Sequence, residues 1–362
     1  MPVSAGPDGD GRAAPSGPPM RAVIAFAAAF AVFAIALVPL AQRPGPPIPG
    51  FVSLFVAGFA VTELSTAFLL FVRFRERRTW SLLMLCCAYF YSGLMPIPHL
   101  LTFPGAVLAE RPIVAGSQAT AWIFNAWISG FALLALISII LEAWFADRRI
   151  SHGKVRLGGA AALGAVLIVT AAMVVGLMTS ADRLPHLVSG PTWTALDWVA
   201  GWLAVLLLGA GIAIVLFVIG ERSRLYLWLG LALTAMMFAN TLSTVGGGRF
   251  TVGWSAGRLS WLLSSCVLFV YLMVLHARDH RLLVRAGDLL VNSEASWTPD
   301  RDRGPRPASP TLEAAMQRFV ARENIARYRK MLEMPHDEAH RQVISRMLAE
   351  QENLLETLDK SA

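Results

Sequence analysis

Few residues in the apolar parts of this sequence carry ionisable side chains that could bind a ligand or transfer a proton. Glu63 is the first of them along the chain. It lies near the middle of an apolar run, within VTELSTAFLL, where a charged carboxylate needs a cation, a proton or water nearby. His99 and Arg258 lie at the ends of two other apolar runs. Ionisable groups inside a membrane are costly and often mark ligand or ion sites, so these three residues are candidates for a binding site. The alternative for Glu63 is a structural role, protonated or hydrogen-bonded to its Ser and Thr neighbours.

The segment YFYSGLMPIPHLLTFPG, residues 89–105, places two prolines directly before His99. Pro96 and Pro98 each remove a backbone donor and crowd the preceding turn, which predicts a kinked or broken helix. Irregular backbone at membrane depth is tolerated only where protein or trapped water satisfies the carbonyl groups. The segment is therefore a candidate ligand site, and the alternative is an ordinary frayed end of a membrane helix.

Other polar side chains in the apolar runs are sparse. Asn125, Asn240 and Thr241 can add polar contacts, although as links between helices they need no further role. Asp197 lies at the mouth of another run and is expected to be solvated. The candidate set for ligand sensing is Glu63, His99, Arg258, Pro96, Pro98, Trp122 and Asn240.

The composition indicates which elements must position these residues. The chain has 362 residues, of which 56% are hydrophobic and 15% charged, and its mean hydropathy is +0.56. Average soluble domains contain about 25% charged residues, so the sequence predicts an all-α, polytopic membrane helix bundle. Eight transmembrane helices are expected near residues 21–41, 51–72, 80–102, 119–145, 157–178, 195–219, 225–245 and 256–276.

Arginine and lysine are divided unequally between the loops. One alternate set of loops holds Arg73, Arg75, Arg77, Arg78, Arg148, Arg149, Lys154, Arg156, Arg222, Arg224, Arg278, Arg281 and Arg285, and the other set holds only Arg43, Arg111, Arg183, Arg249 and Arg258. Basic loops stay in the cytoplasm, so the first set is predicted to be cytoplasmic. With eight spans, both termini are then cytoplasmic as well.

Aromatic and sulfur residues fit a membrane bundle. Five tryptophans are expected near span ends, in the headgroup region: Trp80, Trp122, Trp193, Trp198 and Trp254. Two others, Trp127 and Trp261, are expected to pack inside the bundle. Cys86, Cys87 and Cys266 have no ligand or disulfide spacing and are interpreted as buried thiols.

Signatures of catalysis and of cofactor binding are missing from the sequence. It contains no HExxH, GxSxG, P-loop or GxGxxG motif, and Gly246–Gly248 is interpreted as a tight turn between helices. No facing pair of histidines supports haem, and no metal or other cofactor is expected. We therefore predict that the protein is not an enzyme.

The ends of the chain differ from the apolar part. Residues 1–20 predict a disordered cytoplasmic tail, 21–285 the membrane domain, 286–309 a linker and 310–360 a cytosolic helical hairpin. In the hairpin, the first helix is expected to begin at Ser309-Pro310 and to end at Pro335, and Asp337 is expected to cap the second. Acids and bases nearly cancel there, so nucleic-acid binding is not expected.

Four pieces of the sequence, in order, resemble a known family. They are TELSTAFLLFVRFR (62–75), AYFYSGLMPIPHLLTFPGAV (88–107), QATAWIFNAW (118–127) and GRFTVGWSAGRLSWLLSSCVLFVYLM (248–273). From about residue 51 to 285 the chain resembles the fourth type of the MASE series, bacterial membrane-associated sensor domains. The family tends to have Trp-His where this chain has Trp127-Ile128.

The resemblance implies an input module of the bacterial inner membrane. Such modules commonly precede a diguanylate cyclase (GGDEF) or histidine kinase domain, and neither follows here. The function expected is thus a non-catalytic sensor in the lipid bilayer that signals to a kinase or cyclase in trans, with homodimerisation through the C-terminal helices. The alternative is a small-molecule or proton-coupled transporter, although only one proline-broken span is found and no matching one.

Overall fold

The computed structural model describes two compact units, Met1–Arg281 and Leu282–Ala362, which are treated separately below. The described residues are 20–45, 48, 50–107, 112–114, 117–181, 183–295, 318, 321–322, 324–326, 328–329, 332 and 338–360. The predicted tail at 1–20 and most of the predicted linker lie outside them, as do Ser309, Pro310, Pro335 and Asp337.

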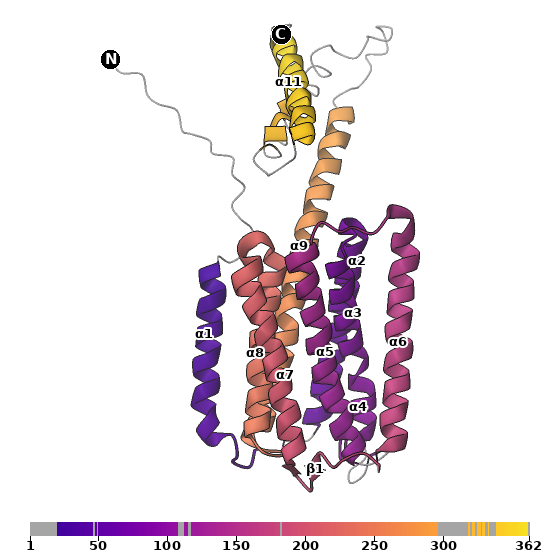
Figure 1. The fold of residues 1–362 in the computed structure, drawn as a ribbon, viewed down its shortest axis with the longest axis vertical. Helices are drawn as coiled ribbons and strands as arrows, with labels where there is room; N and C mark the ends of the chain where they lie inside the picture. Colours follow the sequence, from indigo (N-terminus) through magenta and orange to yellow (C-terminus); the bar gives the residue numbers. More distant parts are fainter. Residues whose placement is uncertain are drawn as a thin grey trace, which may run out of the picture. The chain divides into compact units, whose positions relative to one another are not determined.

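The first unit is a bundle of helices that run alternately up and down (Figure 1). Its helices are α1 (Met20–Leu37), α2 (Phe51–Arg77), α3 (Trp80–Leu94), α4 (Pro96–Thr102), α5 (Ser117–Phe145), α6 (Val155–Ser180), α7 (Ala195–Ile214), α8 (Arg224–Val245) and α9 (Val252–Ala295), the last of which continues past this unit. Short 3-10 turns and one π turn join some of them, at Val38–Leu40, His152–Lys154, Val215–Ile219 and Gly220–Arg222. Two short strands, β1 (Val188–Ser189) and β2 (Thr192–Trp193), pair antiparallel with Val188 opposite Trp193.

The predicted fold class, an all-α membrane bundle, is confirmed. Among the described residues, seven helices are long and apolar enough to cross a membrane: Phe51–Arg77, Trp80–Thr102, Gln118–Phe145, His152–Ser180, Ala195–Arg222, Arg224–Val245 and Val252–Arg281. The predicted first span forms a shorter apolar helix, Ile24–Leu40, so the eighth crossing remains a prediction. This helix lies beside α8, where the rings of Phe30 and Phe238 are 6.0 Å apart.

The helices differ in how much of their surface the protein covers. The spans Trp80–Thr102 and Arg224–Val245 are mostly buried inside the bundle, whereas His152–Ser180 is almost entirely exposed. Side chains such as Ile168 and Phe217 point outward, and an exposed apolar surface of this kind suits contact with lipid.

Aromatic rings fill the centre of the bundle. Trp127 lies 4.7 Å from Trp261 and 5.1 Å from Phe59, measured between ring centroids, which confirms that both tryptophans pack internally. Trp254 lies near the start of α9, at the end of a span as predicted, and its side chain is almost completely covered by protein. The tight turn Gly246–Gly248 lets α9 start beneath Phe51 and Phe103, and their rings cover the indole.

The predicted helix break in residues 89–105 is present at Met95. Helix α3 ends at Leu94 and α4 begins at Pro96, where the missing N–H of proline would have no intrahelical partner in any case. The Thr102 hydroxyl donates to the Pro98 carbonyl at 2.9 Å, and Thr120 of α5 donates to the Thr102 carbonyl. Hydroxyl groups thus bond to carbonyls within and at the end of α4, the short helix that follows the break.

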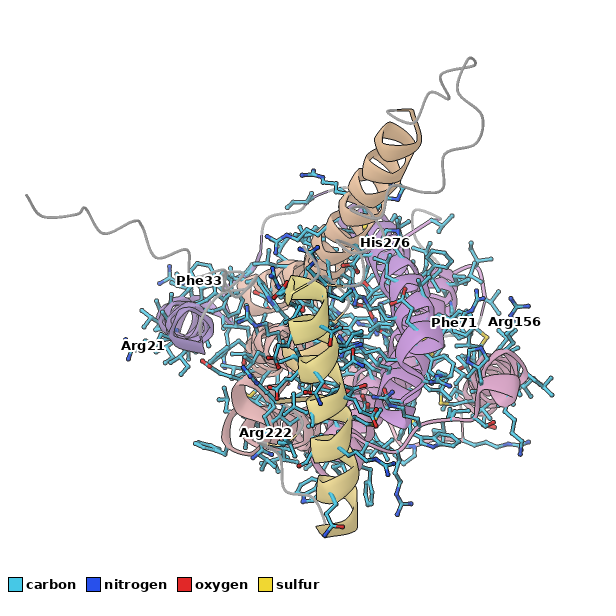
Figure 2. The ribbon with its side chains drawn as sticks, turned by 90° about the horizontal axis from the view of Figure 1, so that it is seen from above. Arg21, Phe33, Phe71, Arg156, Arg222 and His276 are labelled. Carbon is cyan, nitrogen blue, oxygen red and sulfur yellow. The ribbon has the colours of Figure 1, made fainter. Side chains whose placement is uncertain are left out.

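Basic residues gather at one end of the bundle, called here the arginine-rich end. Figure 2, which views this end, shows Arg21, Arg156, Arg222 and His276 around it. The opposite end, called here the loop end, carries the connections 38–50, 103–114, 181–194 and 246–251 (Figure 1). Arg21, near the start of α1, and His276 of α9 lie at the same end (Figure 2), as the predicted alternation of loops requires.

The second unit contains α11 (Glu338–Lys360) and described helical residues between 318 and 332. Arg329 pairs with Glu352 at 2.7 Å, and Asn324 donates to Gln351 at 3.2 Å. Buried Ile325 and Ile344 lie in the same unit. The predicted boundaries of the hairpin remain predictions.

Gly257 provides a test of how closely α8 and α9 pack. A Cβ atom there would lie 2.6 Å from the backbone oxygen of Ala239, so Gly257→Ala must push the two helices apart. We expect it to destabilise the protein by about 1–3 kcal/mol, the usual cost of overpacking. The measurement is thermal unfolding in detergent. Gly164→Ala in α6, with nothing within 4 Å, is the control and should not lower the unfolding midpoint.

Candidate functional site

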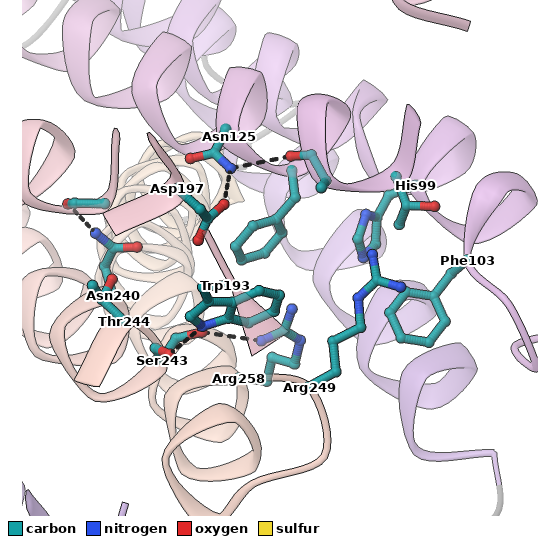
Figure 3. A pocket seen from close by; sticks show the side chains of 14 residues that line it. His99, Phe103, Asn125, Trp193, Asp197, Asn240, Ser243, Thr244, Arg249 and Arg258 are labelled. Carbon is teal, nitrogen blue, oxygen red and sulfur yellow. Dashed lines mark hydrogen bonds between the residues drawn. The ribbon is translucent and has the colours of Figure 1, made fainter. Parts of the chain in front are cut away.

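A small cavity lies among the helices at the loop end (Figure 3). Its volume is about 30 Å³. Three residues of the sequence-predicted set line it: His99 from α4, Asn240 from α8 and Arg258 from α9. The remaining lining residues are Phe103, Thr120, Ala121, Phe124, Asn125, Trp193, Asp197, Gly201, Ser243, Thr244 and Arg249.

Arg258 is held inside the protein mainly by aromatic rings. Its side chain is almost fully covered, with 3% of its surface exposed, and its guanidinium carbon lies 4.0 Å from the Trp254 ring and 4.7 Å from the Phe124 ring. Such contacts contribute about 2 kcal/mol when desolvated. One terminal nitrogen donates two long bonds of 3.4 Å, to the Ser243 hydroxyl and the Trp254 carbonyl, and Nε has no partner among the described residues.

His99 is enclosed in the same way. Its ring centroid lies 5.6 Å from those of Phe103 and Phe124 and 5.8 Å from that of Trp127. Neither ring nitrogen has a hydrogen-bond partner in the described part of the chain, although a neutral imidazole offers one donor and one acceptor. The cavity wall therefore presents unpaired polar atoms from two different helices.

Asp197 and Arg249 bring opposite charges to the cavity. Asn125 donates to a carboxylate oxygen of Asp197 at 2.8 Å, so Asp197 is half-buried and hydrogen-bonded rather than solvated as the sequence suggested. The guanidinium of Arg249 lies over the Phe103 ring at 5.4 Å. Burial lowers the pKa of Arg249, and the charge of Asp197 opposes that shift.

Hydrogen bonds between elements fix the far wall of the cavity. Asn240 donates to the Gly201 carbonyl of α7 at 2.7 Å, and the Trp193 indole donates to the Ser243 carbonyl at 3.0 Å. Sequence analysis missed Trp193 and Arg249 as site residues, because it assigned both only to a membrane-facing or loop role. Both residues lie in or beside short turns, where the sequence has no helical periodicity that could indicate which way a side chain points.

The other predicted candidates lie elsewhere. The Trp122 indole donates to the Pro185 carbonyl at 3.1 Å, and Pro96 and Pro98 shape the break before His99 without lining the cavity. Glu63 is buried beside Tyr89 and Ser92, and one of its oxygens has no partner among the described residues.

Trp127 connects the Glu63 region to the cavity. Its indole donates to the Ser92 hydroxyl at 3.0 Å, while its ring packs on His99. Glu63 and the cavity are therefore on opposite sides of one buried tryptophan. Within the described residues, no group of three or more His, Cys, Asp or Glu side chains could hold a metal ion.

The region of the chain that matches a known protein family includes the whole of this site. Residues 46–276 match MASE4, described as a membrane-associated sensor, integral membrane domain. The chain belongs to the MASE4 family. The matched region contains Glu63 and every residue that lines the cavity. No curated protein matches the chain, and no solved structure does. This MASE4 protein is an integral membrane sensor with several apolar helices.

Asn240 tests whether the cavity wall depends on the bond between α7 and α8. Asn240→Leu removes the donor and with it the bond to the Gly201 carbonyl, which keeps only its partner within α7. Side-chain bonds between membrane helices average about 0.6 kcal/mol and reach about 1.7 kcal/mol, so a loss in that range is expected in detergent unfolding. Thr241→Val is the control, because Thr241 bonds only to the Met237 carbonyl in its own helix. An equal loss in both variants would contradict a specific role for the interhelical bond.

Proposed function

We propose that this MASE4 protein detects a ligand in the cavity of His99, Arg249 and Arg258 and signals to a separate partner without catalysing a reaction. The signal would leave through α9 and the C-terminal helices. The observation that carries the proposal is that a cavity residue with an unpaired buried nitrogen, Arg258, belongs to the helix that leaves the bundle.

Helix α9 supports a direct mechanical route. It has 44 residues and runs without interruption from Val252 to Ala295. At 1.5 Å per residue this is roughly 66 Å, which is longer than the roughly 30 Å of hydrocarbon it must cross. A ligand that contacts Arg258 more favourably in one position of α9 than in another would shift the population of that position.

The arginine distribution supports an inner-membrane protein with both termini in the cytoplasm. The basic loops gather at the end where Arg21 of α1 and His276 of α9 lie (Figure 2). By the positive-inside rule this end is cytoplasmic, and the cavity then opens toward the periplasmic side. The partner we propose is a kinase or diguanylate cyclase in trans, because these are the outputs to which such modules are commonly joined.

The C-terminal unit supports a role in contact with other proteins. Helix α11 exposes Met347 and Leu354, while Ile344 is buried. Exposed apolar side chains on a short amphipathic helix suit either a partner or a second copy of the chain. We propose the same unit as the surface for homodimerisation.

Arg258→Gln tests the route from cavity to α9. The substitution removes the charge and the contacts with Trp254 and Phe124, so the position of α9 should change. We expect hydrogen exchange of the full chain in nanodiscs to rise about tenfold or more in the second half of α9. Arg183→Gln is the matched control, because Arg183 is an exposed arginine at the same end. Identical exchange in both variants would argue against transmission through α9.

Glu63→Gln tests whether the buried carboxyl takes part. Gln keeps the size and cannot carry a charge, so the fold should be as stable as before or more stable. We expect the response of α9 exchange to an Arg258 substitution to be weakened by Glu63→Gln, since Trp127 links the two regions. Glu76→Gln, exposed on the same helix, should leave that response unchanged. Additive effects of the two substitutions would remove Glu63 from the mechanism.

A further inference from the structure

The geometry points to one small monovalent anion, of the size of chloride, nitrate or formate, as the ligand of the cavity. This inference rests on the function proposed above for the same site. It goes further because it assigns the charge, the size and the binding groups of the ligand.

The charges around the cavity leave an excess of one positive charge. Arg249 and Arg258 each contribute a guanidinium, which stays protonated in proteins, and Asp197 contributes a single carboxylate. His99 is the fourth titratable group that lines the space, and both guanidinium groups are close enough to it to interact electrostatically. A buried charge without a counter-charge costs several kcal/mol, so an anion in this space is favoured over water alone.

Among the described residues that line the cavity, the nitrogen atoms without a hydrogen-bond partner belong to two that carry or border the positive charge, Arg258 and His99. Asn125, Asn240, Thr120 and Trp193 already donate to protein oxygens. By contrast, Nε of Arg258 and both ring nitrogens of His99 have no partner among the described residues. Figure 3 shows the guanidinium of Arg249 beside the His99 ring and that of Arg258 beside Trp193, with its bond to Ser243. An anion there would accept a bond from Nε of Arg258, and from the N–H of a neutral His99 when that N–H turns to the cavity and away from the nearby Thr120 backbone.

The size of the cavity limits which anions fit. A space of this kind needs roughly 10–15 Å³ for each water molecule, so about 30 Å³ holds two or three waters or one small ion. The small space favours small anions over sulfate, phosphate and larger carboxylates. The rings of Phe103, Phe124 and Trp193 form the walls, and they exclude the water that would otherwise solvate the ion.

A second, apolar pocket of about 330 Å³ adjoins the cavity and provides the competing ligand class. It is lined by Phe51, Phe103, Phe250 and Trp254, and Phe103 lines both spaces. A carboxylate with a long apolar tail would have to displace the Phe103 ring, over which Arg249 lies. The Phe103 ring between the two spaces therefore favours an anion without a tail.

The test is a titration of the full chain in nanodiscs of neutral lipid, in gluconate buffer at constant ionic strength. Chloride, nitrate and formate are added separately, and the thermal unfolding midpoint and the line width of chloride NMR are measured. We expect a saturable rise of the midpoint with each small anion and none with sulfate. Arg258→Gln and His99→Phe should weaken binding at least tenfold, whereas Arg183→Gln should bind as the unaltered chain does.

His99→Phe keeps an aromatic ring among Phe103, Phe124 and Trp127, so the test survives if Arg258→Gln fails to fold. Lack of a saturable effect, or equal affinity in the His99→Phe and Arg183→Gln variants, would overturn the proposal. A response to decanoate without one to formate would also overturn it and would assign the site to a tailed acid. Normal anion binding without any change in α9 exchange would instead refute signalling and leave the anion site standing.

Discussion

The burial of the Arg258 guanidinium is the constraint on which the loop end of the bundle depends. A charged group at this depth must be compensated by neighbouring side chains, since water is largely excluded. The protein supplies two aromatic faces, Trp254 and Phe124, and two long hydrogen bonds, which together leave Nε unpaired. The tight turn before α9, the break before α4 and the pairing of β1 with β2 all bring residues to the surroundings of this one side chain.

The proline break explains how a histidine comes to face that arginine. An unbroken helix from Trp80 to Thr102 would keep its own carbonyls bonded and would continue straight. Starting a new helix at Pro96 lets the short helix α4 carry His99 to the cavity, and the hydroxyls of Thr102 and Thr120 bond to the Pro98 and Thr102 carbonyls toward the end of that helix. The same hydroxyl of Thr120 joins α4 to α5, so the position of His99 is fixed from two helices.

The helices and the buried ionisable residues could be predicted from composition and periodicity. Which of these residues share a cavity could not be predicted, because that depends on contacts between residues far apart in the sequence. Apolar runs gave the helices, and the cost of intramembrane charge gave Glu63, His99 and Arg258. The sequence could not tell that Glu63 lies behind Trp127 while His99 and Arg258 share a cavity, because this depends on how α4, α5 and α9 pack. For a similar reason the sequence placed Trp254 near a span end but could not show that other residues cover its indole.

Arg258 lies next to two glycines at which α9 packs closely against α8. This position matters for how a ligand bound to Arg258 could change the far end of α9. At Gly253 and Gly257 the backbone of α9 lies so near the α8 carbonyls of Leu242 and Ala239 that a Cβ atom would clash. Packed backbones of this kind slide or tilt as units and deform little locally. Arg258 therefore lies next to a point where α9 is closely packed against α8, which is the arrangement that the proposed transmission along the continuous helix would need.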